Sequence, residues 1–309
     1  MNEGEVIMGC TTAYPPRAGF RRWLWVVGVV SVLALAGCQS SQQAHSKKIE
    51  LVYVEWSSAV ASTNVVRAVL EKAGYKVELT PVSAAAMWQA VASGDADAMV
   101  AAWLPTTHKH YYEKVKDQVV DLGPNLEGTR IGLVVPDYVT IDSIAQLNAN
   151  AAKFDGRIIG IDPGAGIMSK TQQALKDYHL NHLQLITGSG ATMAAALADA
   201  IRNHQWIVVT GWTPHWMFAR WKLKYLQDPK GVYGKGGHID TVVRKGLKQA
   251  EPGAYAILDR FHWTPGDMEQ VMQMNRKKGS DPYADAKQWV KEHPQLVDQW
   301  LGQATGNGG

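Results

Sequence analysis

The chain carries the pattern strand, helix, strand, helix, strand twice, and this repeat constrains the fold more than any other feature of the sequence. Each copy opens with a short apolar run and continues with helices whose apolar residues recur every three or four positions. The expected first copy has strands 49–54, 75–79 and 98–101 and helices 59–73 and 84–92. The expected second copy has strands 157–161, 183–186 and 206–210 and helices 166–178 and 191–203.

Two such units favour two similar lobes over one continuous sheet, because each unit is long enough to bury a parallel sheet of its own. We therefore expect an α/β protein with two lobes. Each lobe would be a βαβαβ-based sheet flanked by helices, with the ligand in the cleft between the lobes. Two apolar segments, 132–136 and 238–244, are suited to cross between the lobes and serve as the hinge.

The helical pattern after Pro252 is assigned to the first lobe, with three prolines near expected helix starts: Pro265, Pro282 and Pro294. The predicted division of the chain is therefore residues 49–130 and 220–302 for lobe 1, 131–219 for lobe 2, and 303–309 for a disordered tail.

The first residues predict export. An apolar run at 23–36 follows Arg21 and Arg22; it is too short to span a bilayer but suits a signal peptide, with Met1 or Met8 as the start. The run ends at Leu35-Ala36-Gly37-Cys38, which resembles the bacterial lipoprotein cleavage box. This resemblance implies a signal peptide at 1–37 and lipidation of Cys38. A polar tether at 38–48 would then hold the protein on a membrane, facing the periplasm or the cell exterior. The alternative is an ordinary signal peptide with a chance cysteine.

Composition excludes several classes of site. Cys10 and Cys38 are the only cysteines, so the body of the protein can hold no disulfide framework, cysteine nucleophile or cysteine metal cluster. The formal charge of +3 comes without a long basic block, which argues against nucleic acid as a partner. His108 and His110 could begin a metal site, but no third ligand is placed to complete it. We expect a monomer without cofactor or metal.

Tryptophan is unusually frequent, with 12 residues against 4 phenylalanines. Trp56, Trp103 and Trp212 each follow an apolar strand pattern, at the edge of a parallel sheet where ligands bind. A methylated ammonium ion cannot donate hydrogen bonds through its methyl groups, so an aromatic cage is the main way to bind it in water. The alternative for a single tryptophan is a core position, and we assign four others to the core: Trp88, Trp206, Trp289 and Trp300.

Three segments resemble the substrate-binding proteins of bacterial ABC importers for glycine betaine. They are 95–108 (DADAMVAAWLPTTH), 160–168 (GIDPGAGIM) and 209–218 (VTGWTPHWMF). The resemblance covers the chain from about residue 49 to beyond residue 260. It implies a two-lobed fold like that of periplasmic binding proteins. It also implies that Trp56, Trp103 and Trp212 form a box for the trimethylammonium group.

The resemblance further implies that the ligand carboxylate is held by the backbone amides of Gly166 and Ile167 and by His108. The residues themselves are compatible with this role. The turn from Gly164 to Gly166 opens a helix, where free N–H groups and the helix dipole favour an anion. His108 lies five residues beyond Trp103, in a loop expected to face the cleft.

The resulting hypothesis is a binding receptor, not an enzyme, that captures glycine betaine or a related betaine and delivers it to a membrane permease for osmoprotectant uptake. One alternative is a receptor for choline or carnitine. Another is an exported enzyme with His108 or His215 as a base, although no Ser-His-Asp order, carboxylate pair or metal signature supports it. His215 and Trp216 are expected to begin a helix and pack. Neighbouring acidic residues are expected to point away from the cage or to stabilise turns: Glu55, Asp95 and Asp97.

Overall fold

The computed structural model describes residues 47–303 of the chain. The predicted signal peptide, the predicted lipidation site Cys38, most of the predicted tether and nearly all of the predicted tail lie outside the described residues. No helix within residues 47–303 is both long enough and apolar enough to cross a bilayer.

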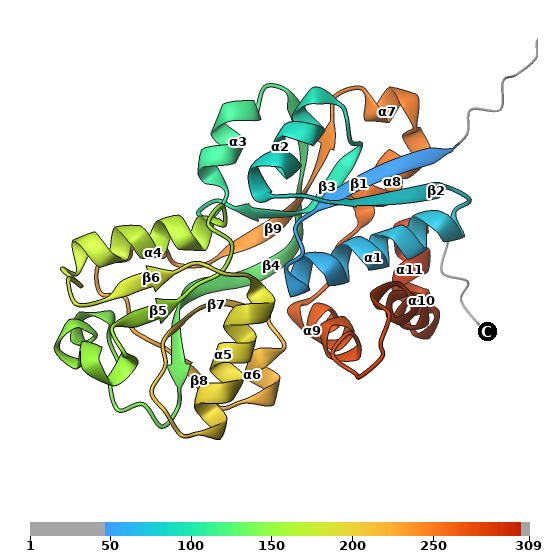
Figure 1. The fold of residues 1–309 in the computed structure, drawn as a ribbon. Helices are drawn as coiled ribbons and strands as arrows, with labels where there is room; N and C mark the ends of the chain where they lie inside the picture. Colours follow the sequence, from blue (N-terminus) through green and yellow to red (C-terminus); the bar gives the residue numbers. More distant parts are fainter. Residues whose placement is uncertain (1–46, 304–309) are drawn as a thin grey trace, which may run out of the picture. The chain divides into compact units, whose positions relative to one another are not determined.

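One long strand, β4 (Val119–Pro136), links two sheets (Figure 1). Its first part, residues 119–129, pairs with β9, and its second part, residues 130–136, pairs with β7 and β8. The strand order is β2-β1-β3-β9-β4-β7-β5-β6, with β8 on β4. The polypeptide therefore passes from one lobe to the other inside a single hydrogen-bonded strand.

The first sheet combines three parallel strands with antiparallel β9 and the start of β4. Its other members are β1 (Lys48–Tyr53), β2 (Lys76–Pro81), β3 (Ala98–Leu104) and β9 (Gly237–Arg244). All seven residues of β3 are buried, as expected for a central strand covered on both faces.

The second sheet is built on the end of β4. Its other members are β5 (Arg157–Ile159), β6 (Gln184–Ile186), β7 (Val209–Thr213) and β8 (Leu223–Tyr225). Strands β5, β6 and β7 are parallel, while β7 and β8 run antiparallel to β4.

Helices cover both faces of the first sheet. Figure 1 shows α2 and α3 on one side and α1, α9 and α10 on the other. The helices before β4 are α1 (Ser57–Lys72), α2 (Ala84–Ser93) and α3 (Lys109–Val115). Those after β9 are α7 (Leu247–Ala250), α8 (Pro252–Arg260), α9 (Pro265–Met274), α10 (Pro282–Glu292) and α11 (Pro294–Leu301). Helices α8, α9 and α10 contact α1, so the end of the chain packs on the first lobe.

The helices of the second lobe lie between its strands. They are two 3-10 helices, η1 (Ile144–Gln146) and η2 (Asn148–Phe154), followed by α4 (Gly166–Asp177), α5 (Gly190–Arg202) and α6 (Met217–Arg220).

Local sequence fixes several of these boundaries. Ser189 accepts a hydrogen bond from the Thr192 N–H and so caps α5. Gly94 ends α2 in the left-handed conformation at φ 83°, which glycine adopts without a steric penalty. Four helices, α8 to α11, begin with proline, whose missing N–H is not needed at a helix start.

The predicted α/β fold with two lobes is confirmed, and two details of the prediction are wrong. Strand β8 pairs with residues 134–136 of β4, so the second sheet extends beyond residue 219, where the predicted lobe 2 ended. Strand β9, predicted to cross between lobes, pairs only with β3 and β4 inside the first sheet. The reason is its register. All seven pairings between β9 and β4 lie on the part of β4 before residue 130, which belongs to the first sheet.

The tryptophans assigned to the core are buried in three of four cases. Trp88, Trp289 and Trp300 are at most 1% exposed. Trp206 is only partly buried, because its ring lies at the surface against Phe154 and beneath the Lys153 ammonium group.

Candidate functional site

The six residues predicted to bind a ligand line one pocket. Trp56, Trp103 and His108 come from the first lobe, and Gly166, Ile167 and Trp212 come from the second. The space between these side chains is about 320 Å³, part of it open to solvent. The other lining residues are Ser58, Thr107, Ile131, Ile161 and Ala165.

The three indoles reach the pocket from three different elements. Trp56 lies in the turn between β1 and α1, Trp103 in β3 and Trp212 in β7. Each is 5–6% exposed. The strands were predicted to end at residues 101 and 210, two residues before Trp103 and Trp212. Strands β3 and β7 in fact continue one residue past each tryptophan, so both tryptophans lie inside a strand.

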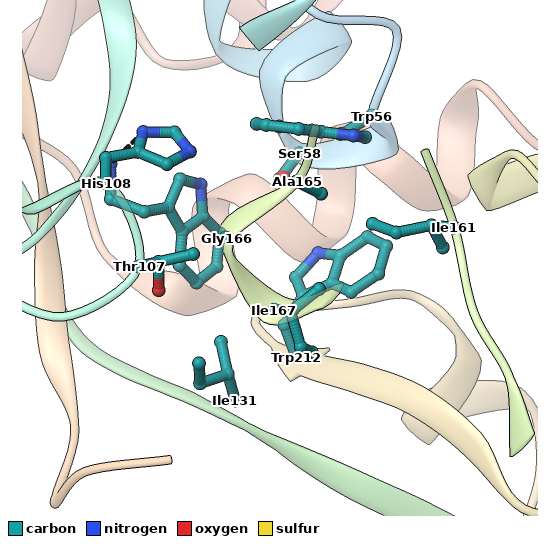
Figure 2. Close-up of a pocket in the computed structure, with 11 residues that line it drawn as sticks. Trp56, Ser58, Thr107, His108, Ile131, Ile161, Ala165, Gly166, Ile167 and Trp212 are labelled. Carbon is teal, nitrogen blue, oxygen red and sulfur yellow. Dashed lines mark hydrogen bonds between the residues drawn. The ribbon is translucent and has the colours of Figure 1, made fainter. Parts of the chain in front are cut away.

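Figure 2 shows the arrangement around this space: Trp56 at the top, His108 at the upper left, Trp212 at the lower right and Gly166 between them. The ring centroids of Trp56 and His108 are 5.6 Å apart. Aromatic faces next to a ring nitrogen give the pocket one surface suited to a soft cation and one suited to an anion.

His108 is held by the strand that carries Trp103. Its backbone N–H donates to the Trp103 carbonyl at 2.8 Å, and its Nδ1 accepts from the Trp103 N–H at 3.1 Å. Because Nδ1 is an acceptor, the proton of the neutral ring is on Nε2. That Nε2 is buried and has no hydrogen-bond partner within residues 47–303. The imidazole therefore offers a buried N–H donor beside the aromatic walls.

Burial keeps this ring neutral. His108 is 0% exposed, and desolvation, with a smaller contribution from the charge of His110, lowers its pKa to about 3. At neutral pH the ring acts as a hydrogen-bond donor without a positive charge.

The amides of Gly166 and Ile167 begin α4, and the first N–H groups of a helix have no acceptor within it. Gly166 lies so close to the first lobe that an added Cβ would be 2.0 Å from the Thr107 carbonyl oxygen. Only glycine allows the start of α4 to approach the loop before His108 in this way.

Two hydrogen bonds join the lobes at the same place. The Trp56 Nε1–H donates to Asp162 Oδ2 at 3.2 Å, and the Tyr111 hydroxyl donates to the Gly164 carbonyl at 2.8 Å. The pocket thus lies between lobes that are in contact.

His215 and Trp216 lie behind Trp212 and line a separate cavity, together with Glu55. The His215 ring packs edge-on against Trp212 at 4.6 Å between centroids, and its Nδ1 accepts from the Met217 N–H at 3.1 Å. His215 therefore supports the wall formed by Trp212 from outside, and Trp216 packs against His215.

The two aspartates at the start of the first motif have structural roles. Asp97 accepts from the Glu50 N–H at 2.9 Å and from Arg244 Nε at 2.7 Å, which ties β1 to the end of β9. Asp95 accepts from the Ser93 hydroxyl just beyond α2. Within residues 47–303, no group of three or more His, Cys, Asp or Glu side chains is arranged to hold a metal ion.

The sequence pattern did not reveal the residues that complete the pocket or those that join the lobes. Thr107, Ile161 and Asp162 lie within the motifs, but nothing in their type distinguishes them from loop residues. Ile131 directly precedes the segment predicted to cross between lobes, and its side chain lines the pocket from β4. Tyr111 belongs to α3, a helix that was not predicted.

Comparison with known proteins places these features in a family. Residues 47–292 match the model of the substrate binding domain of ABC-type glycine betaine transport systems. The glycine betaine/carnitine transport binding protein GbuC of Listeria monocytogenes is 52% identical over 145 residues, which is 46% of this chain and 48% of that protein. The alignment thus spans about half the length of this curated relative.

Two solved structures are similar over most of the described residues. Lactococcal OpuAC, closed and complexed with glycine betaine, is 46% identical with a TM-score of 0.79, covering 82% of this chain and 99% of that chain. An ABC-transporter choline binding protein in complex with choline is 26% identical with a TM-score of 0.79, covering 85% of this chain and 95% of that chain. This chain belongs to the family of substrate-binding domains of ABC-type glycine betaine transport systems.

Proposed function

We propose that this protein is an extracytoplasmic receptor that binds glycine betaine between its lobes and delivers it to the permease of an ABC importer for osmoprotectant uptake. The observation that carries the proposal is the buried Nε2–H of His108, which finds no acceptor within residues 47–303 and shares its pocket with three indole rings. A ligand that satisfies both features has a methylated cation at one end and a hydrogen-bond acceptor at the other.

Glycine betaine meets both requirements. Its trimethylammonium group would lie among Trp56, Trp103 and Trp212, and its carboxylate would accept from His108 Nε2 and from the Gly166 and Ile167 amides. Each desolvated contact between a cation and an indole contributes about 1–2 kcal/mol. Together with the carboxylate contacts, we expect a net binding free energy of about −8 kcal/mol, which corresponds to a micromolar Kd.

Choline is the main alternative ligand, since a similar protein has been solved in complex with choline. Choline has the same cationic group but no carboxylate, so it would leave the two amides of α4 without an anion to bind. A buried donor without a partner costs about 1–3 kcal/mol. We therefore expect choline to bind more weakly than glycine betaine, and carnitine to be limited by its greater length.

The remaining parts of the proposal concern the setting of the protein. Residues 1–37 would serve as a signal peptide, and lipidation of Cys38 would anchor a monomer to the membrane beside its permease. The relatives are transport proteins, and we propose that this chain likewise releases its ligand chemically unchanged.

Calorimetric titration of the wild-type protein and of His108→Ala and His108→Gln with glycine betaine and choline tests the site. His108→Ala should weaken glycine betaine binding by about 1.5–3 kcal/mol, because a hydrogen bond to a charged group is lost. His108→Gln, which retains an N–H donor, should recover part of this loss.

Choline serves as the control ligand, because it uses the cage but not the carboxylate site. If His108→Ala weakens both ligands equally, the histidine shapes the cage through its bond to Trp103 and does not bind the carboxylate. Absence of glycine betaine binding by the wild-type protein would refute the proposal itself.

A further inference from the structure

The segment 161–167 of the second lobe, here named the clamp loop, touches the first lobe at three points. Asp162 accepts from the Trp56 indole at 3.2 Å, the Gly164 carbonyl accepts from the Tyr111 hydroxyl at 2.8 Å, and Gly166 lies against the Thr107 carbonyl. The same loop ends in the Gly166 and Ile167 amides that line the pocket. One short segment therefore takes part both in contact between the lobes and in completion of the pocket.

Asp162 is attached firmly to this segment. Its carbonyl accepts from the Ala165 N–H at 2.9 Å, which closes the turn leading into α4. The side chain is partly buried, and its carboxylate reaches out of the second lobe to the first. Any movement of Gly166 and Ile167 toward the first lobe thus carries the carboxylate of Asp162 toward Trp56.

The ring of Trp56 is held by packing, since it is 6% exposed, and by one hydrogen bond. Trp56 precedes α1 as the N-cap residue but makes no side-chain cap hydrogen bond, and the single hydrogen bond of its indole within residues 47–303 is the one to Asp162. The ring is also 5.6 Å from that of His108. Rotation of this indole would remove one wall of the pocket.

The chemistry of this bond also affects the ring itself. An indole N–H that donates to a carboxylate is polarised, which raises the electron density of the ring. A cation over an aromatic face is attracted by that negative density. The carboxylate can therefore strengthen the attraction between Trp56 and a cation while it remains outside the set of residues that line the pocket.

We infer that Asp162 is a positioning residue, a latch that links closure of the lobes to assembly of the cage by holding and polarising the Trp56 indole. The inference rests on the proposed function, because it assigns the cationic end of the ligand to Trp56. The proposed roles of Asp162 and His108 differ in the ligands that they affect: loss of His108 should weaken glycine betaine more than choline. The latch acts through the wall that faces the ammonium group, so betaine and choline should both depend on it.

The decisive experiment is a double-mutant cycle on Trp56 and Asp162. Glycine betaine and choline are titrated into the wild-type protein, Asp162→Ala, Trp56→Phe and the double variant. Asp162→Ala should weaken both ligands by about tenfold, in line with a hydrogen bond to a charged group that is only partly buried. Trp56→Phe keeps an aromatic face but has no N–H, so Asp162→Ala should add less than about twofold in that background. Full additivity of the two effects would overturn the latch.

Two further variants separate geometry from charge. Asp162→Asn keeps an acceptor for the indole but lacks the negative charge, so its affinity should lie between those of the wild-type protein and Asp162→Ala. Tyr111→Phe is the matched control, since it removes the other hydrogen bond between the clamp loop and the first lobe but keeps the ring that packs edge-on against His108. A loss of affinity in Tyr111→Phe as large as in Asp162→Ala would mean that any contact between lobes has the same effect, and would overturn the specific role of Asp162.

Small-angle X-ray scattering separates failure of the latch from failure of the proposed function. If the wild-type protein binds neither ligand, the proposed function fails. The latch is then decided on the ligand-free protein, where Asp162→Ala should give a larger radius of gyration than the wild type because fewer molecules are closed. Identical scattering from the two proteins would overturn the latch in that case.

Discussion

At the scale of single residues, the pocket combines three indoles that are almost equally buried, at 5–6% exposure, yet come from different elements. Trp289, for comparison, is fully buried and stacks on His293 and Trp300. Burial alone does not separate the two groups. The distinction is that the three indoles share a space with the His108 N–H, a donor without a partner among the described residues.

Removal of one cage wall should reduce affinity and leave the fold intact. We expect Trp56→Ala, Trp103→Ala and Trp212→Ala each to weaken glycine betaine binding by about 1–3 kcal/mol, because a contact with the cation is lost and water enters. Trp289→Ala, as a control, should lower the free energy of unfolding by about 3–5 kcal/mol and spare affinity. Calorimetry and urea denaturation measure the two quantities. Normal binding by all three cage variants would refute the cage.

All six of the predicted site residues line the pocket, because tryptophans at strand ends and a glycine-rich helix start meet at the same edge of the sheets. The pattern could not predict which nitrogen of His108 carries the proton, since that depends on the backbone N–H of Trp103 donating to Nδ1. The sequence pattern could not predict the contact between Asp162 and Trp56 either. The partner of Asp162 is 106 residues away, and an aspartate before proline and glycine resembles any turn residue.

At the scale of elements, α4 brings its first turn against the loop that precedes α3. Gly166→Ala should prevent this approach, because a Cβ 2.0 Å from the Thr107 carbonyl oxygen requires the lobes to separate. We expect a loss of glycine betaine affinity of at least about tenfold with a nearly unchanged melting temperature of the ligand-free protein, since alanine favours a helix. Gly164→Ala is the control, because its Cβ would lie 3.6 Å from the Tyr111 hydroxyl, an ordinary contact. Equal affinity of the two variants would contradict the need for this close approach.

Strand β9 carries a buried acid close to the link between the lobes. Asp240 is 3% exposed, and burial, together with the charge of Asp121, raises its pKa to about 7; His238 Nε2 is 3.3 Å from its Oδ1. A pKa raised in the folded state means that the folded protein binds more protons than the unfolded chain between about pH 4 and 7. The contribution of Asp240 to the free energy of unfolding should therefore fall as pH rises through this range.

Asp240→Asn should remove the loss of stability that accompanies ionisation of Asp240. At about pH 8 the variant should be more stable than the wild-type protein by about 1–2 kcal/mol, because a buried carboxylate no longer has to ionise near Asp121. At about pH 4 the two proteins should differ little, since Asp240 is then protonated in the folded wild type and about half protonated in the unfolded chain. Urea denaturation at the two pH values measures the difference. A variant that is less stable than the wild type at the higher pH would show that the charge of Asp240 is needed in the folded state.

The order and type of the repeated elements followed from apolar periodicity, and most predicted boundaries lie within two or three residues of those observed. The full length of β4, the short strand β8 and helix α3 were missed. Residues 119–129 contain Gly123, Pro124 and Gly128, which normally interrupt a strand, and here they coincide with shifts in the register between β4 and β9. Pairing with a partner more than about 100 residues away decides this region, and local pattern cannot reveal it.

At the scale of the whole molecule, the two sheets are joined through β4, so relative motion of the lobes must bend or twist this strand near residues 129–130. The ligand would lie between the lobes and hold them together. This arrangement accounts for a receptor that captures its ligand by closing and releases it by opening.

Membrane attachment should depend on one residue outside the described part of the chain. Cys38→Ser should leave the protein unprocessed or free in solution, because a lipid chain on this sulfur is the proposed anchor. Cell fractionation and mass spectrometry of the mature N-terminus measure both outcomes. A wild-type protein with an unmodified N-terminus at another residue would contradict the anchor, while leaving the binding site unaffected.

A crystal structure of the protein grown with glycine betaine would locate both ends of the ligand in a single measurement. We expect one ligand in the pocket, with its methyl groups facing Trp56, Trp103 and Trp212. One carboxylate oxygen should accept from His108 Nε2, and the carboxylate should also accept from the Gly166 and Ile167 amides. A ligand bound in the opposite orientation, or in the separate cavity behind Trp212, would contradict the proposed mode of binding.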